Sequence, residues 1–224
     1  MGRIARVVVP GMPHHVTQRG TRRQPIFFKE VDRNAYKRLL KNACERYGVQ
    51  VWAYCLMENH VHLIVVPEKE TSLPKAVGAA HHKYSCYISR REGWTGHLWQ
   101  ERFSSFLMDE NYLIAAVRYV ERNPVEAGLV SKAEDYPWSS ARAHVSGGKD
   151  PLLTPCFLTE RITDWVSFLS GPQDRDIARR IEDHGKVGLP LGSDEFIRRI
   201  EAQVGRSLPK KQSIHLVTGT KCTK

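Results

Sequence analysis

The 224-residue sequence lacks the features that mark several large classes of protein. Its five cysteines are scattered, odd in number and never spaced as Cys-x-x-Cys, so we expect no disulfide framework, no thiolate zinc site and a reducing compartment. No apolar run reaches the length of a membrane span, so we expect no membrane association. Residues 1–13 have no long apolar core and no small-residue cleavage site, which predicts a cytoplasmic protein without a signal peptide.

Acidic residues are missing from both ends of the sequence. Residues 1–23 hold five arginines and no acid, and residues 205–224 hold five basic residues and no acid. The other 24 basic residues are balanced by 24 acidic ones, so the net charge of +10 lies entirely at the two ends. Basic ends favour a polyanionic partner, most often a nucleic acid. The alternative is that they serve solubility alone.

The hydrophobic pattern predicts an α+β protein. We expect strands over residues 14–19, 49–57, 60–66 and 103–108. Helices are expected over residues 33–47, 73–91 and 111–122, with Asp32 capping the first and Asn123-Pro124 ending the third. The order β-α-β-β-α-β-α is typical of a ferredoxin-like antiparallel sheet backed by helices.

Composition also predicts how the chain is divided. A main domain is expected over residues 1–145, followed by a Gly/Pro-rich linker at residues 146–156. Short amphipathic patterns predict a helical extension over residues 157–208. The polar, basic stretch at residues 209–224 is expected to be a flexible tail.

The stretch MENHVHLIVV, residues 57–66, raises the question of function. Residues i and i+2 of a strand share a face about 6–7 Å apart, so His60 and His62 can converge on one divalent ion. The alternative is a polar face on an exposed edge strand. Because the residues after His60 are apolar in both phases, we favour a central, covered strand on which two histidines need partners. Two ligands do not close a metal site, so a third must come from elsewhere.

The stretch RYVERNPVEAG, residues 118–128, offers that third group. Tyr119 and Asn123 are four residues apart on the predicted third helix and therefore share a face. If that face meets the histidine strand, the site gains an amide ligand and a phenol, and a phenol near a metal-bound phosphate is a plausible nucleophile. From the spacing alone, a core tyrosine and an asparagine that caps the helix before Pro124 are the favoured interpretation.

Two interpretations also apply to LWQERF, residues 98–103. Trp99 and Arg102 can stack on and hold an unpaired base. Alternatively, Trp99 and Phe103 are apolar anchors of the fold. Five other histidines are expected to be surface or structural residues rather than metal ligands, namely His14, His15, His81, His82 and His97.

Five segments in order resemble the REP-associated tyrosine transposases, bacterial single-tyrosine members of the HUH nuclease superfamily. They are HHVTQRG, AYCLMENHVHLIVVP, GHLWQERF, RYVERNPVEAGLV and DYPWSSARAH, and the resemblance covers residues 3–145. A weaker resemblance continues through LGSDEFIRRIEAQVGRSLPKK.

The resemblance implies a metal site and a nucleophile. His60 and His62 match the HUH pair and would hold Mg²⁺ or Mn²⁺. Asn123 lies where related transposases place a third polar ligand, often glutamine, and Tyr119 matches the nucleophile. The implied reaction is cleavage and rejoining of single-stranded DNA through a 5′-phosphotyrosine.

The resemblance also implies the partner, single-stranded DNA with a palindromic (REP) hairpin, bound by a monomer associated with the nucleoid. The residues expected to contact DNA are Arg3, Arg6, Arg19, Arg22, Arg23, Arg102, Trp99, Lys210 and Lys211, and the extension at residues 157–208 is a further candidate. Two alternatives remain at this point. One is a non-catalytic nucleic-acid-binding protein on the same fold, and the other is a metal-dependent hydrolase of a small phosphoester that uses water as nucleophile.

Overall fold

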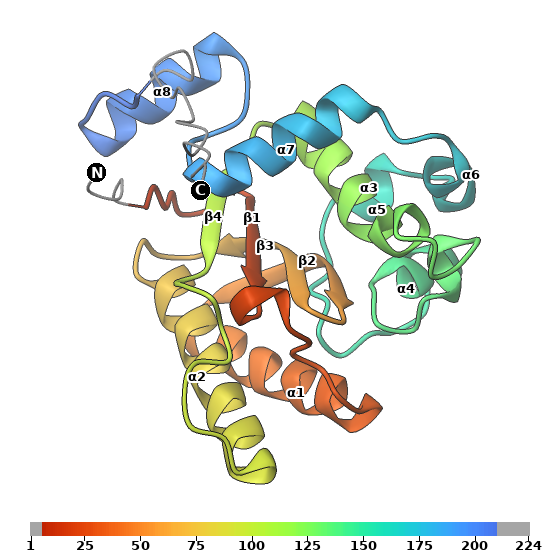
Figure 1. The fold of residues 1–224 in the computed structure, drawn as a ribbon. Coiled ribbons are helices and arrows are strands. Elements are labelled where there is room, and N and C mark those ends of the chain that lie inside the picture. The colour runs from red at the N-terminus through yellow and green to blue at the C-terminus, as the bar shows by residue number, and fades with distance from the viewer. Residues whose placement is uncertain (1–5, 210–224) are drawn as a thin grey trace, which may run out of the picture.

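The computed structural model describes residues 6–209, which form a four-stranded antiparallel sheet with helices on both faces (Figure 1). The spatial order is β2-β3-β1-β4, and the strands are β1 (His14–Arg19), β2 (Val49–Met57), β3 (His60–Pro67) and β4 (Ser104–Leu107). Helix α1 (Glu30–Tyr47) connects β1 to β2, and helix α2 (Ser72–Glu92) connects β3 to β4. The predicted ferredoxin-like α+β fold is confirmed.

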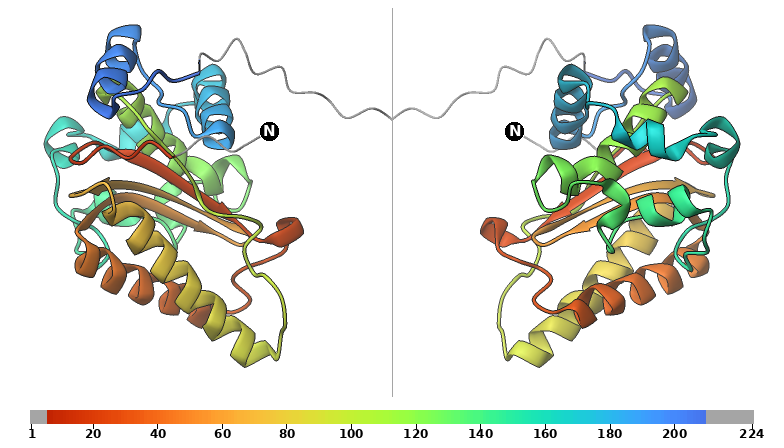
Figure 2. Two further views of the ribbon diagram at one scale, coloured as in Figure 1. Left: turned by 90° about the vertical axis from the view of Figure 1, so that its left-hand side faces the viewer. Right: turned by 90° about the vertical axis from the view of Figure 1, so that its right-hand side faces the viewer.

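The helices form two layers, with the sheet between them (Figure 2). Helices α1 and α2 cover one face, and α3 (Glu110–Glu126) covers the other. The remaining helices are α4 (Ala141–Ser146), α5 (Leu158–Arg161), α6 (Trp165–Ser170), α7 (Arg175–Val187) and α8 (Asp194–Val204). None of the helices within residues 6–209 is long and apolar enough to cross a membrane.

Strand β3 lies inside the sheet, as its apolar residues predicted. It pairs with β2 on one side and with β1 on the other, and both of its faces are covered. Val61, Leu63 and Val65 pack against α1 and α2. Because side chains alternate along a strand, His60 and His62 lie on the opposite face, under α3.

Two predicted helix boundaries were wrong. Helix α1 begins at Glu30 rather than after Asp32, because the Asp32 carboxylate lies inside the first turn and accepts a hydrogen bond from the Lys29 backbone. Helix α3 continues to Glu126 instead of ending at Arg122. Pro124 falls in the last turns of α3, where the missing N–H removes one hydrogen bond and the helix is not broken. Asn123 is therefore a helical residue and not a cap.

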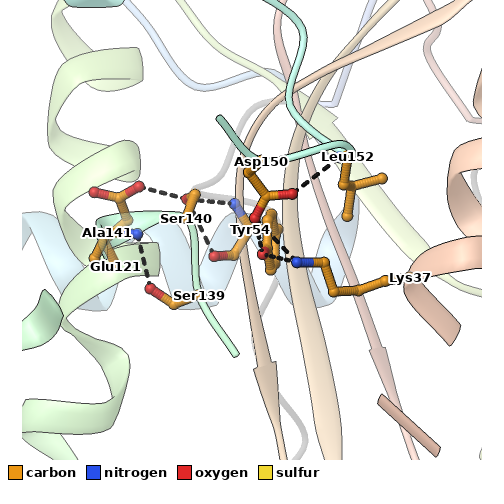
Figure 3. Close-up of polar contacts among 8 residues, drawn as sticks. All are labelled: Lys37, Tyr54, Glu121, Ser139, Ser140, Ala141, Asp150 and Leu152. Atoms are coloured by element: carbon orange, nitrogen blue, oxygen red, sulfur yellow. Dashed lines mark hydrogen bonds and ion pairs between the residues drawn. The ribbon is translucent and has the colours of Figure 1, made fainter. Parts of the chain in front are cut away.

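Residues 146–156, predicted as a linker, are fastened to the main domain. The side chain of Leu152 is buried in the core under α1 and α2. Asp150 accepts a hydrogen bond of 2.5 Å from the Tyr54 hydroxyl (Figure 3). Thr154 donates its backbone N–H to the edge strand β2, at a distance of 2.8 Å. The segment therefore holds α4 and the following helices to the sheet and is not a free connection.

Candidate active site

A cleft with a volume of about 840 Å³ opens between α3, α7 and the strands β1 and β3. The four residues predicted to form the site line it together, and they are His60, His62, Tyr119 and Asn123. The face alternation of β3 and the helical spacing of α3 therefore predicted the right neighbours.

The two histidines of β3 lie with their ring centroids 4.8 Å apart. His60 Nδ1–H donates to the side-chain oxygen of Asn59 at 2.6 Å. His62 Nδ1 lies 2.9 Å from Nε2 of His15 on β1. Each Nδ1 is therefore occupied by a neighbour, which leaves Nε2 of both rings for a ligand.

Both histidines are uncharged at neutral pH. Burial lowers the pKa of His60 to about 4. The positive charge of Arg19 lowers this pKa further, and the interaction with the Asn123 side chain raises it. Burial lowers the pKa of His62 well below its ordinary value, and the neighbouring His60, His15 and Arg19 add to the shift. Neutral imidazole is the form that binds a metal ion.

Tyr119 points from α3 towards the histidine pair. Its ring centroid lies 5.5 Å from that of His62, and the two rings are almost perpendicular. The Asn123 side chain lies close enough to lower the pKa of the Tyr119 hydroxyl and to raise that of His60, so one amide neighbours both the phenol and the predicted metal site. Burial raises the pKa of Tyr119, and the charge of Glu182 raises it further.

Helix α7 supplies the opposite wall of the cleft, although it belongs to the part of the chain predicted as a separate extension. The Tyr119 hydroxyl donates to Glu182 Oε1 at 3.4 Å. Gly185 marks where α7 packs on the sheet, since a Cβ atom there would make ordinary van der Waals contact with Thr17 at 3.9 Å and with Phe106 at 4.0 Å. Within the predicted extension, residues 173–186 are thus part of the site's structure.

The side chains present suit a divalent cation with open coordination positions. Within residues 6–209 no cluster of three His, Cys, Asp or Glu residues could hold a metal. The candidate donors are the two Nε2 atoms and the amide oxygen of Asn123, which line the same cleft. Two imidazoles and one oxygen leave room for substrate oxygens, an arrangement compatible with Mg²⁺ or Mn²⁺.

Three of the predicted arginines line the cleft, namely Arg19, Arg23 and Arg102. Arg22 is exposed beside Arg23 on a 3-10 turn, and both have positive backbone φ angles, 53° and 62°. Such backbone conformations are unfavourable for residues other than glycine and are found preferentially at functional sites. The tight turn depends on Gly20, where a Cβ atom would lie only 2.4 Å from the backbone oxygen of Gln24.

Two residues predicted to contact DNA have structural roles in this fold. Arg6 is half-buried, lies 3.7 Å over the ring of Phe103 and donates to the Phe103 backbone oxygen at 2.5 Å. Trp99 packs on the α1/α2 side of the sheet, stacked 4.4 Å from the ring of His81. The structural interpretation of Trp99 therefore describes its packing better than base stacking. Arg3, Lys210 and Lys211 lie outside the described residues.

Sequence reasoning missed three residues of the site. His15 was expected to be a surface or structural residue, yet it is buried beside His62. The alternation of His15, Thr17 and Arg19 on one face of β1 could be read from the sequence, but the register that brings His15 beside His62 could not. Asn59 directly precedes the histidine strand and was given no role in the site. Glu182 lies in the amphipathic helix α7, and nothing in its own segment indicated that the helix would reach Tyr119.

Comparisons with known proteins agree with this geometry. The family model described as "Transposase IS200 like" matches residues 8–123, just over half of the chain. A Haemophilus influenzae protein, described as a candidate REP-associated tyrosine transposase, is 25% identical over 118 residues, which are 48% of this chain and 67% of that protein. The solved structure of a REP-associated tyrosine transposase bound to a REP hairpin superposes with a TM-score of 0.56. It is 18% identical, over 70% of this chain and 93% of that one, and therefore supports the fold.

Proposed function

Because this chain belongs to the family of IS200-like transposases, we propose that it cleaves and rejoins single-stranded DNA at palindromic hairpins through a covalent bond to Tyr119. The observation that carries this proposal is the convergence of the Tyr119 phenol, the Asn123 amide and two neutral imidazoles in one cleft. A DNA-binding protein without chemistry has no need of that constellation.

His60, His62 and Asn123 would hold Mg²⁺ or Mn²⁺. When bound, the cation would supply Lewis-acid polarisation of the scissile phosphate. Asn123 also lies beside the Tyr119 hydroxyl, where it would help to keep the nucleophile next to the place where that phosphate must lie. Arg19 adds positive charge beside His60 and favours an anionic substrate.

In the proposed reaction the Tyr119 oxygen attacks phosphorus and the bond to the 3′ oxygen breaks. The products are a 5′-phosphotyrosine and a free 3′-hydroxyl, and the attack of another 3′-hydroxyl reverses the step. Glu182 Oε1, the hydrogen-bond acceptor of the phenol, is placed to take its proton. The covalent bond preserves the ester, so rejoining needs no nucleotide cofactor.

The proposed partner is single-stranded DNA with a REP-like hairpin, the ligand of the superposed transposase. Arg23 and Arg102 line the cleft and would bind backbone phosphates. All four central residues come from a single chain, so a monomer has a complete site. We propose action as a monomer on chromosomal DNA in the cytoplasm.

Metal dependence tests the proposal directly. A labelled single-stranded hairpin, incubated with Mn²⁺ or Mg²⁺, should give a protein–DNA band that survives SDS. EDTA should abolish it, and His60→Ala should lower the rate by on the order of 10²-fold or more, because one of three protein donors is lost. Unchanged cleavage in EDTA would contradict the metal site, and cleavage without a covalent band would favour water as the nucleophile.

Removal of a cleft arginine should weaken DNA binding in a salt-dependent way. For Arg102→Ala we expect the slope of log K against log salt to fall by about 0.7, the value for one phosphate contact on a single strand. Arg38→Ala removes the same charge from the exposed surface of α1, away from the cleft, and should leave the slope unchanged. Fluorescence anisotropy at several salt concentrations measures both. Equal slopes for the two variants would place the DNA elsewhere.

A further inference from the structure

The two histidines of the proposed metal site differ in how their Nδ1 atoms are held. The partner of His60 is the side-chain oxygen of Asn59, which can only accept, so the proton of His60 lies on Nδ1. The partner of His62 is a third imidazole, His15. An imidazole nitrogen can donate or accept, so the tautomer of His62 depends on which nitrogen of His15 carries the proton.

We propose that His15 is a positioning residue for the metal site, which carries its proton on Nδ1 and accepts the Nδ1–H of His62 at Nε2 when His62 Nε2 binds a divalent cation. The inference rests on the proposed function, since it assumes that His60 and His62 hold a metal ion. Partners of this kind fix the tautomer and the orientation of a ligating ring.

The surroundings of His15 support this role. Its side chain is 2% exposed and contacts the edge of Phe106, with ring centroids 5.2 Å apart. Antiparallel pairing of β1 with β3 places His15 and His62 diagonally on one face, and their rings are within 5° of parallel. Little freedom is therefore left to the ring that meets His62.

The hydrogen bonds of His15 point the same way. Its Nδ1 is buried and has no hydrogen-bond partner among residues 6–209, so among these residues the side chain's hydrogen bond is the one to His62. An unpaired buried polar atom costs about 1–3 kcal/mol. An apolar side chain would fill the position without that cost, so packing does not explain the imidazole, whereas an acceptor for His62 does.

The test is a Mn²⁺ titration of the metal-free protein, followed by electron paramagnetic resonance. Loss of a residue that hydrogen-bonds to a metal ligand typically lowers metal affinity about 10- to 100-fold. Because His15 is an uncharged acceptor, we expect His15→Phe to lower the affinity about tenfold. His15→Gln keeps an acceptor oxygen near the position of Nε2 and should restore most of the affinity. Long-range ¹H–¹⁵N spectra of the Mg²⁺-loaded wild type should show protons on Nδ1 of both His15 and His62.

His81→Phe is the matched control, because it removes another buried imidazole, bonded to the Tyr36 hydroxyl on the other side of the sheet. It should leave Mn²⁺ affinity unchanged. Wild-type affinity in His15→Phe, or a proton on His15 Nε2 in the loaded protein, would overturn the inference while leaving the proposed function standing. Absence of Mn²⁺ binding by the wild type would overturn both.

Discussion

Tyr119→Phe should abolish the covalent protein–DNA complex and lower strand cleavage by on the order of 10³-fold or more, at least about 4 kcal/mol in the activation barrier. The substitution removes one oxygen and leaves the ring in its contact with His62, so folding and DNA binding should persist. A denaturing gel of a labelled hairpin oligonucleotide measures the covalent band, and anisotropy confirms that binding is retained.

Tyr112→Phe is the matched control for this experiment. Tyr112 lies on the same helix, and its hydroxyl accepts a hydrogen bond from Arg180 on α7. The substitution removes a phenolic hydroxyl from the contact between α3 and α7 and leaves the histidine pair unchanged. Cleavage should therefore stay within a few-fold of wild type. Cleavage that persists in Tyr119→Phe would contradict the tyrosine mechanism and favour water as the nucleophile.

The centre of the site could be predicted because it depends on short-range geometry. Alternation along β3 fixes which face His60 and His62 share, and helical spacing places Asn123 one turn after Tyr119. The order of strands and helices could be predicted in the same way, from the spacing of apolar residues along the chain. The positions of these side chains are confirmed, while their chemical roles remain predictions.

What could not be predicted depends on contacts between segments far apart in the chain. The position of Glu182 against Tyr119 follows from the packing of α7 on α3, which no local pattern specifies. His15 meets His62 through the register of β1 against β3, and a strand sequence does not reveal its register. Residues 146–156 were read as a linker from their glycines and prolines, yet Leu152 contributes to the core.

A group of long-range contacts fixes the orientation of α3, the helix that carries Tyr119. Glu121 lies two residues after Tyr119, roughly 200° around α3, and therefore faces away from the cleft. Its side chain is fully buried and accepts hydrogen bonds from the hydroxyl of Ser140 and from His144 Nδ1 at 2.6 Å. Figure 3 shows Ser140 joining Glu121 to the backbone of Tyr54 on β2. The rotation of α3 is thereby tied to the sheet.

Glu121→Ala should lower the free energy of unfolding by about 3 kcal/mol. The change leaves a cavity and removes the acceptor of Ser140 and His144, and a buried donor left without a partner costs about 1–3 kcal/mol by itself. Urea denaturation, with the variant and wild type compared at constant slope, measures the loss. Glu121→Gln retains an acceptor oxygen and a similar volume, so it should lose less.

Glu126→Ala is the control that shows whether removing any acidic side chain from α3 lowers stability as much as Glu121→Ala does. Glu126 lies on the same helix and pairs with Arg122, but about half of its side chain is exposed. A pair of this kind contributes about 0–1 kcal/mol. A loss of stability in Glu121→Ala no larger than that in Glu126→Ala would show that the buried network does not hold the helix.

If the expected difference is found, cleavage by Glu121→Ala under conditions where it remains folded should fall as well. Tyr119 would then have lost the contact that fixes its direction towards the histidine pair.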